Sequence, residues 1–318
     1  NGNYTMGNVY GDRMTFAYRT GDWRWVHTIN HLADIDIHYY DYETFECPEC
    51  NTEYRADETI PGTDTDWEDA GDGVSCPTCG NATFRDFINH IYSLSGYDIA
   101  NYIGMSNEPS GHVRFQPCLT GINPITGRSL AGEVVDGANR WLRESAAAGH
   151  VNDRFISVSQ YDASWQYGGC ECASCKAMEN LTGSAAGNWI WLCNQVANSI
   201  KDDYPNVMVN TISYLYTVEA PVNIKAEDNV SVFICTNDYC AAHPWNECGV
   251  SLRYGSASDM TKRVSEWQQV CDHLYGYDYY RSMGDNRWLY PIQYQMYYNY
   301  KWYYDLGFEG VYSYMLDE

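Results

Sequence analysis

The sequence predicts an α/β fold with a parallel sheet, and two observations bear on its form. Short apolar runs with strand character alternate with longer amphipathic runs of helical periodicity. This alternation is typical of βαβ units, whose right-handed crossovers build either a doubly wound sheet or a barrel. The sequence contains no Gly-x-Gly-x-x-Gly motif or phosphate loop, which disfavours a dinucleotide-binding sheet. We therefore predict a TIM-type (β/α) barrel, incomplete or irregular because fewer than eight strands can be identified.

The predicted strands are short and rich in β-branched and aromatic residues. In chain order they are 13–19, 155–158, 207–216, 230–236, 275–280 and 310–315. The predicted helices carry apolar residues three and four positions apart, which places these residues on one face. They are 84–97, 129–148, 188–204, 260–274 and 291–306. We expect one barrel-like domain over residues 1–318, with a zinc ribbon inserted at 45–84.

Two Cys-Pro-x-Cys pairs form the most specific local motif of the chain. Cys47 and Cys50 make the first pair, and Cys76 and Cys79 make the second. Four thiolates at this spacing can close a tetrahedral shell around Zn²⁺, and the acidic segment between the pairs has too little apolar content to fold alone. We predict a structural zinc ribbon, because four Cys ligands leave no position open for water. Two disulfides are the alternative if the protein is secreted.

A second cysteine cluster follows the predicted strand at 155–158. Cys170, Cys172 and Cys175 are spaced as C-x-C-x-x-C, and Cys240 and His243 offer further ligands downstream. A Cys₃His or Cys₄ shell would tie two loops together and would be structural, and disulfides are again an alternative. A coordination position left open to water would instead make this site hydrolytic.

Charge and composition limit the class of partner. The 42 acidic and 19 basic residues give a formal net charge of −23, which argues against nucleic acid and anionic membranes. No stretch approaches the roughly twenty apolar residues of a membrane span, and neither a signal peptide nor an initiator Met is present. We expect a segment of a larger parent protein, with flanking domains or self-assembly, that is extracellular or at the cell surface. The 30 tyrosines and 11 tryptophans suit stacking on sugar rings, although most are expected to serve packing.

Five motifs act together as a family signature. They are FAYR at 16–19, QPCLT at 116–120, SVSQYD with the following cysteines at 157–175, YPNVMVNTISYLYT at 204–217 and CTNDYCAAHPWNEC at 235–248. In combination they resemble an uncharacterised bacterial domain-of-unknown-function family of glycoside hydrolase-type TIM barrels, related to α-glucuronidases and hexosaminidases. The resemblance covers most of the chain from Arg13 and implies a barrel fold. The ribbon segment departs from the pattern expected of most relatives.

The resemblance implies a glycoside hydrolase-like protein that acts on carbohydrate. Such enzymes place two carboxyl groups about 5 Å apart for retention or about 6.5–9.5 Å apart for inversion. We predict Asp162 and Glu318 as this pair and Asp278 as a substrate-orienting residue, because each stands where a predicted strand ends. The alternative for Asp162 is a turn cap. The predicted sugar-stacking residues, with rim packing as their alternative, are Trp165, Tyr214, Tyr216, Trp245 and Tyr277.

The alternative function is a non-catalytic one. In that case the barrel is kept as a carbohydrate-binding or surface-assembly module, and the tyrosine-rich surface contacts glycans or neighbouring molecules. Paired carboxyl groups in a cleft lined by aromatic residues would favour the enzyme. Flat aromatic patches and scattered acidic residues would favour the binding module.

Overall fold

The computed structural model describes a defined set of residues in two compact units. These residues are 6–7, 13–14, 28–33, 45–54, 60, 75–82, 105–107, 113–122, 127–149, 154–160, 169–170, 172–236, 243–247, 260–279 and 293–314. The first unit comprises Asn1–Thr28, Ala138–Gln160 and Met178–Glu318, and the second comprises Ile29–Gly137 and Tyr161–Ala177. The expected limits of the ribbon insertion, 45–84, fall inside the second unit and stay a prediction.

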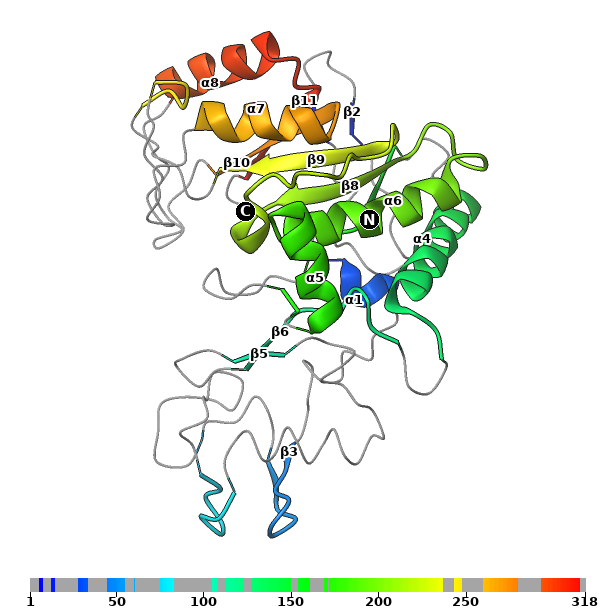
Figure 1. Ribbon diagram of the computed structural model, residues 1–318, viewed down its shortest axis with the longest axis vertical. Helices are drawn as coiled ribbons and strands as arrows, with labels where there is room; N and C mark the ends of the chain where they lie inside the picture. Colours follow the sequence, from blue (N-terminus) through cyan, green and yellow to red (C-terminus); the bar gives the residue numbers. More distant parts are fainter. Residues whose placement is uncertain are drawn as a thin grey trace. The chain divides into compact units, whose positions relative to one another are not determined.

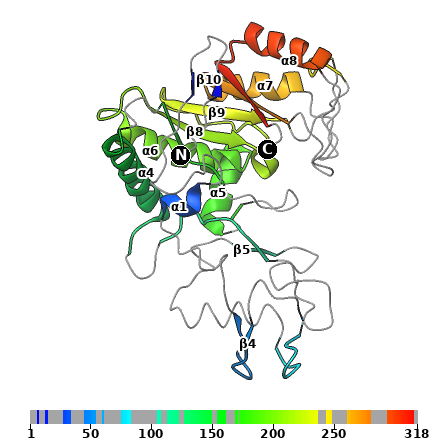
Figure 2. The ribbon, with the colours of Figure 1, turned by 180° about the vertical axis from the view of Figure 1, so that it is seen from behind.

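A five-stranded parallel sheet forms the centre of the first unit (Figure 1). Its strands are β7 (Phe155–Ser157), β8 (Met208–Ser213), β9 (Val230–Cys235), β10 (His273–Tyr279) and β11 (Gly310–Tyr314). The order across the sheet is β11-β10-β9-β8-β7, so each strand pairs with the one that precedes it. Figure 2 shows β8, β9 and β10 side by side from behind. Successive βαβ units in this order form half of a barrel, which confirms the predicted α/β fold with an incomplete barrel.

The strand register determines which side chains share a face of the sheet. Phe233 pairs with Tyr275, and Cys235 pairs with Tyr277. Because side chains alternate along a strand, these four residues point to one side, which we call the inner face. The residues between them in sequence point to the opposite side, which we call the helix-covered face.

Three helices cover the second of these faces. They are α6 (Ala186–Ile200), α7 (Met260–Val270) and α8 (Gln293–Asp305). Their apolar residues pack with Val232, Ile234 and Leu274 of the sheet. The three helices themselves can be followed beside the sheet in Figure 1. Trp267 and Tyr303 are fully buried in this layer. Burial of apolar side chains of this size contributes about 2–3 kcal/mol each, so these two residues are major contributors to the packing.

The four helix predictions that fall on described residues agree with the structure in position, although their ends differ by up to four residues and two described helices were not predicted. The predictions at 129–148, 188–204 and 291–306 correspond to α4 (Leu130–Ala147), α6 and α8. The prediction at 260–274 extends too far, since α7 ends at Val270 and β10 begins at His273. Neither α1 (Ile29–Leu32) nor α5 (Ala173–Thr182) was predicted from the sequence, and α5 begins inside the second cysteine motif. A short 3-10 helix, Leu215–Thr217, follows β8.

The second unit contains short antiparallel pairs. β3 (Phe45–Glu46) pairs with β4 (Glu53–Tyr54), and β5 (Met105–Asn107) pairs with β6 (Val113–Phe115). The short helix α1 (Ile29–Leu32) lies so close to α4 that a Cβ at Gly137 would come within 1.8 Å of the Leu32 carbonyl oxygen.

Two further predicted elements are only partly covered by the structure. The predicted strand at 13–19 is described at β2 (Arg13–Met14), which pairs antiparallel with β1 (Met6–Gly7) in the first unit. The predicted helix at 84–97 lies outside the described residues. None of the described helices combines the length and the hydropathy that a membrane span requires.

Candidate functional site

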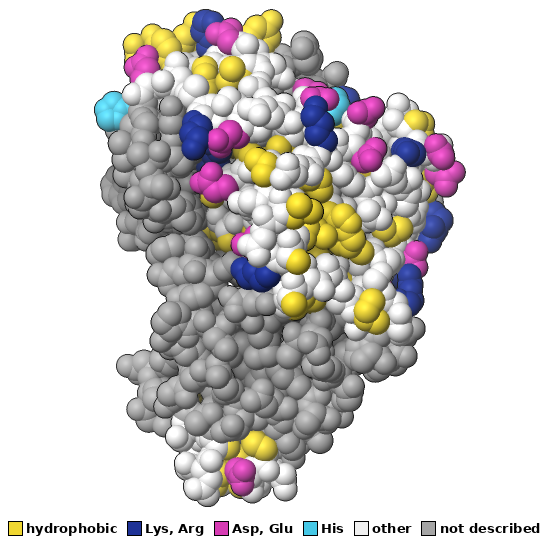
Figure 3. Space-filling view, viewed as in Figure 1, with side chains coloured by type: hydrophobic (Ala, Val, Ile, Leu, Met, Phe, Trp, Pro, Cys, Tyr) yellow, Lys and Arg dark blue, Asp and Glu magenta, His cyan; other side chains and the backbone are white. Residues whose placement is uncertain are grey.

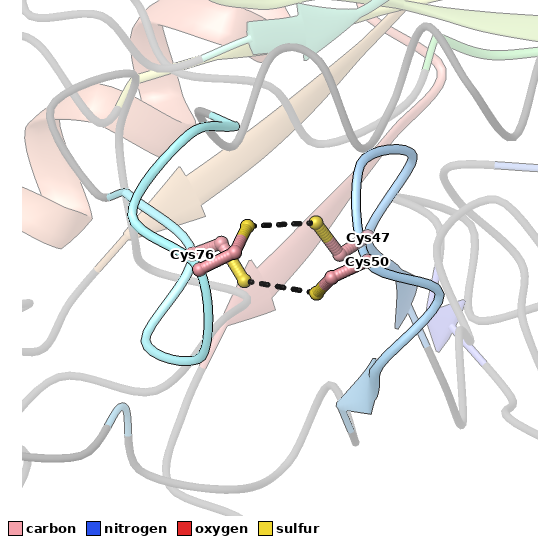
Figure 4. Close-up of side chains that lie close together, drawn as sticks. Cys47, Cys50 and Cys76 are labelled. Atoms are coloured by element: carbon pink, nitrogen blue, oxygen red, sulfur yellow. Dashed lines mark hydrogen bonds between the residues drawn. The ribbon is translucent and has the colours of Figure 1, made fainter.

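The first candidate metal centre brings together the two Cys-Pro-x-Cys pairs (Figure 4). The sulfur atoms of Cys47 and Cys79 are 3.7 Å apart, and those of Cys50 and Cys76 are 3.8 Å apart. All four sulfurs lie within 4.8 Å of one another. A tetrahedral zinc site with Zn–S distances of about 2.3 Å requires neighbouring sulfurs about 3.8 Å apart. The four predicted ribbon cysteines therefore fit a bound zinc ion.

Two matching turns position these cysteines. The Asn51 N–H donates to the Cys47 carbonyl at 2.8 Å, and the Gly80 N–H donates to the Cys76 carbonyl at 2.8 Å. Asn51 and Gly80 both have positive φ, 55° and 69°, a region that asparagine and glycine tolerate best. Each Cys-Pro-x-Cys pair is thus followed by the residue type that lets the chain turn back, and the two thiols of a pair point the same way.

Burial and hydrogen bonds act in opposite directions on the pKa values of the thiols in this centre. Burial raises the pKa of the Cys47 thiol to about 12. Burial acts in the same direction on Cys76, but a side-chain hydrogen bond with Tyr54 and backbone contacts outweigh it and lower its pKa to about 6. The Tyr54 hydroxyl lies 3.0 Å from the Cys76 sulfur. Cys76 therefore ionises most readily, whereas a bound cation would have to displace the proton of the Cys47 thiol.

The second candidate metal centre contains Cys118 together with Cys170, Cys172 and Cys175. The Cys118 sulfur lies 3.5 Å from that of Cys172 and 3.9 Å from that of Cys175. Cys118 was not predicted as a ligand from the sequence, although it stands in the QPCLT motif at 116–120.

The fourth member of this centre is thus not one of the residues proposed from the sequence. His243 belongs to neither group of metal-binding side chains among the described residues, and Cys240 lies outside them.

Both four-cysteine clusters can bind a metal ion such as zinc. The described cysteines are free thiols, and their sulfur separations of 3.5–3.9 Å are well above the roughly 2.05 Å of a disulfide. Four mutually close sulfurs, rather than two separate pairs, are the arrangement that a tetrahedral cation requires.

Only one of the three predicted carboxylates lies in the described part of the chain. Asp162 and Glu318 fall outside it. Asp278 lies near the carboxyl end of β10, but it points to the helix-covered face and is fully buried. Its carboxylate accepts hydrogen bonds from the hydroxyls of Tyr303, at 3.1 Å, and Thr236, at 3.4 Å. The alternation of β10 thus gives Asp278 a packing position instead of the predicted substrate-facing one.

The predicted sugar-stacking residues separate into two groups. Tyr216 accepts a hydrogen bond from the Trp189 indole N–H at 3.0 Å, and Trp245 is buried with its ring 5.6 Å from that of Tyr303. These two side chains therefore have packing partners, which was the alternative considered for them. Trp165 lies outside the described residues.

Tyr214 and Tyr277 belong to an aromatic cluster on the inner face, together with Tyr279 and Tyr312. The ring centroids of Tyr277 lie 5.0 Å from Tyr279 and 4.8 Å from Tyr312. Burial raises the pKa of Tyr279 well above its usual value, so its hydroxyl stays protonated. Tyr279 and Tyr312 were not predicted from the sequence, although the alternation in YGYDYY places Tyr279 on the same face as Tyr277.

A second group of tyrosines is exposed on α8 (Figure 3). Tyr294, Tyr297 and Tyr304 are 61–67% exposed. Tyr298 lies between them, with its ring 4.6 Å from that of Tyr294 and 5.2 Å from that of Tyr297. Their spacing of three, four and seven residues places them on one side of the helix, which we call the α8 tyrosine face.

Comparison with known proteins gives one family match. The model of the family Domain of unknown function (DUF4838) matches residues 110–315. Curated proteins show no significant match. A solved structure of bee venom hyaluronidase in complex with a hyaluronic acid tetramer is similar at a TM-score of 0.33 and 11% identity, over 68% of this chain and 76% of that chain. The family match includes all five strands of the parallel sheet and the second metal centre, and it leaves the first centre outside.

Proposed function

This chain belongs to the family Domain of unknown function (DUF4838), and from its own residues we propose that it is a carbohydrate-active protein of the glycoside hydrolase type. The sugar would bind at the carboxyl edge of the parallel sheet, on the inner face. The observation that carries this proposal is the cluster of Tyr214, Tyr277, Tyr279 and Tyr312 at that edge. Ligands of parallel α/β folds bind where the strands end, and tyrosine combines a stacking surface with a hydroxyl.

The proposed catalytic pair is Asp162 and Glu318. In sequence, Asp162 follows β7 and Glu318 follows β11, and these are the two outer strands of the five. Strands spaced about 4.8 Å apart would put the outer two about 19 Å apart in a flat sheet, too far for either glycosidase geometry. A sheet that curves as in an eight-stranded barrel brings strands four positions apart to opposite sides of one interior. The proposal therefore requires this curvature.

The test is hydrolysis of a panel of chromogenic glycosides, including glucuronides and N-acetylhexosaminides, by the full chain. We expect Asp162→Asn and Glu318→Gln each to lower kcat by about 10²–10⁴-fold, the usual contribution of a general acid or base. Asp305→Asn, which changes an exposed carboxylate on α8, is the matched control and should keep wild-type activity. Activity that survives in both active-site variants would rule out this pair.

The α8 tyrosine face favours a second candidate function, a non-catalytic carbohydrate-binding module. Exposed tyrosines 4.6–5.2 Å apart offer ring surface to a glycan without a cleft. A polysaccharide-binding assay distinguishes the two functions. Loss of binding in Tyr294→Ala and Tyr297→Ala, with normal binding in Tyr277→Ala, would favour the module; the reverse pattern would favour the inner face.

We assign zinc to both four-cysteine centres as a structural ion. Four sulfur ligands leave no open coordination position, so zinc would cross-link chain segments and take no part in hydrolysis.

A further inference from the structure

We propose that Cys118 completes a second zinc centre in which the hydroxyl of Thr120 sets the metal affinity. The inference rests on the zinc assignment made above and deepens it, because it names a residue outside the four ligands. Neither the spacing of the cysteine motif nor the family description points to Thr120. The evidence is the arrangement of polar groups around the four sulfurs.

The four sulfurs of this centre are shielded from water more completely than those of the first. Cys118, Cys170 and Cys175 are buried, and only Cys172 is half-buried; in the first centre both Cys50 and Cys79 are half-buried. A Zn²⁺ ion with four thiolates carries two net negative charges. A buried dianion requires nearby donors, because water contributes little to its solvation.

The start of α5 supplies one set of these donors. Cys172 immediately precedes the helix and Cys175 lies in its first turn. The Cys175 N–H points to the Cys172 sulfur at 3.4 Å, and the Cys172 N–H points to the Cys170 sulfur at 3.4 Å. The positive end of the helix dipole also faces this negative charge. The charge at two of the four sulfurs, those of Cys170 and Cys172, is thus stabilised by the backbone.

Thr120 supplies a donor from the other side of the cluster. Its hydroxyl oxygen lies 3.3 Å from the Cys175 sulfur, 3.6 Å from the Cys172 sulfur and 3.7 Å from the Cys118 sulfur. No backbone N–H to the Cys118 sulfur is among the contacts of the described residues. A hydroxyl has one proton to donate, and in this position any of three thiolates can accept it. Thr120 is therefore a positioning residue for the metal ligands and not a ligand itself.

The first centre repeats this arrangement and provides a matched control. Thr52 follows Cys50 by two residues, as Thr120 follows Cys118, and its hydroxyl lies 3.1 Å from the Cys50 sulfur. Each centre thus has a Cys-x-Thr step whose hydroxyl faces its own sulfurs. A valine at either threonine keeps the shape of the side chain and removes the donor.

The first experiment measures zinc in the purified full chain by elemental analysis. We expect two zinc ions per chain in the wild type, one in Cys118→Ser and one in Cys47→Ser. One zinc in the wild type that disappears in Cys47→Ser would overturn the second centre. So would non-reducing peptide mapping by mass spectrometry if it showed that Cys118 is bonded to another cysteine.

The second experiment tests Thr120 by competition with a chromophoric chelator. Thr120→Val should weaken the second zinc by at least about tenfold and leave the first unchanged, while Thr120→Ser should restore affinity. Thr52→Val should weaken only the first zinc. Cobalt substitution assigns the site, since the sulfur-to-cobalt absorption of Cys47→Ser arises from the second centre alone. Two bound zinc ions with equal affinity in Thr120→Val and wild type would disprove the role of Thr120 while leaving the zinc assignment intact.

Discussion

The hydroxyl of Tyr303 donates a 3.1 Å hydrogen bond to the carboxylate of Asp278, and both side chains are fully buried. The bond joins α8 to the carboxyl half of β10. Burial raises the pKa of the Tyr303 hydroxyl well above its usual value, so the donor keeps its proton. The Tyr303 ring also stacks on Phe308 at a centroid distance of 4.3 Å. A polar contact thus helps to fix α8 in a largely apolar layer, where the buried side chain of Asn299 on α8 also accepts a hydrogen bond from the Trp245 N–H.

Removing this hydroxyl should destabilise the fold. We expect Tyr303→Phe to lower the free energy of unfolding by about 1.5–3 kcal/mol, because Asp278 loses a donor in a buried place. Urea unfolding followed by tryptophan fluorescence measures the change. Tyr304→Phe is the control, since the Tyr304 side chain is 61% exposed. Removing its hydroxyl should change the free energy of unfolding by less than about 0.5 kcal/mol. Equal stability of the two variants would contradict the packing role of Asp278.

The position of the Tyr303 ring also requires a glycine at position 276. A Cβ at Gly276 would lie 2.6 Å from a ring carbon of Tyr303. Gly276→Ala should therefore cost about 1–3 kcal/mol of stability through overpacking. Combining it with Tyr303→Leu provides the check. The two changes should be less than additive in unfolding experiments, because a smaller side chain at 303 removes the clash.

The pair formed by His273 and Glu309 should make stability depend on pH. The hydrogen bond with Glu309 raises the pKa of His273 above its usual 6.5, and the bond with His273 lowers the pKa of Glu309 below its usual 4.5. The raised histidine pKa stabilises the fold below pH 6.5, and this contribution is lost as the pH rises through the raised value. The lowered glutamate pKa stabilises above pH 4.5 and is lost as the pH falls through the lowered value.

The contribution of this pair is therefore greatest between about pH 4.5 and 6.5. Both side chains are about one third exposed, so we expect less than about 1 kcal/mol. Thermal unfolding of His273→Gln across pH 4–9 should show a smaller difference from wild type at alkaline pH than at pH 6. Lys262→Gln, which removes an exposed ion pair with Glu266, should not change the shape of the pH profile.

Metal removal should affect the ribbon and the parallel sheet differently. A strong chelator should disorder the segment around Cys47 and Cys76, because short strands such as β3 and β4 cannot hold it together without the metal. The parallel sheet should keep its protection in hydrogen exchange. Loss of protection in β8 and β9 at the same chelator concentration would show that the bound metals stabilise more than the segments that hold them.

The sequence predicted the elements whose signals are local. Helical periodicity located α4, α6 and α8 within a few residues, and apolar runs located the strands of the sheet. The ribbon cysteines were found because each pair contains its own turn. In α5 the cysteine spacing concealed a helix start, since the metal-binding candidates Cys172 and Cys175 also lie immediately before the helix and in its first turn.

The candidate site was harder to predict because it depends on which face a residue occupies. Asp278 stands at the end of a strand, as predicted, but a shift of one residue along a strand reverses the face. Tyr277 and Tyr279 point inward for the same reason that Asp278 points to α8. Cys118 was missed because 52 residues separate it from Cys170 in sequence, and only the tertiary fold brings the two together.

The strand order β11-β10-β9-β8-β7 has a consequence for synthesis on the ribosome. Each strand leaves the ribosome directly before the one it pairs with, so the sheet can grow by one βαβ unit at a time. Until β11 arrives, every intermediate presents β8, β9 or β10 as an unpaired edge rich in apolar residues. Such edges are templates for intermolecular pairing. Aggregation of the nascent chain should therefore be most severe when translation stalls between β9 and β10.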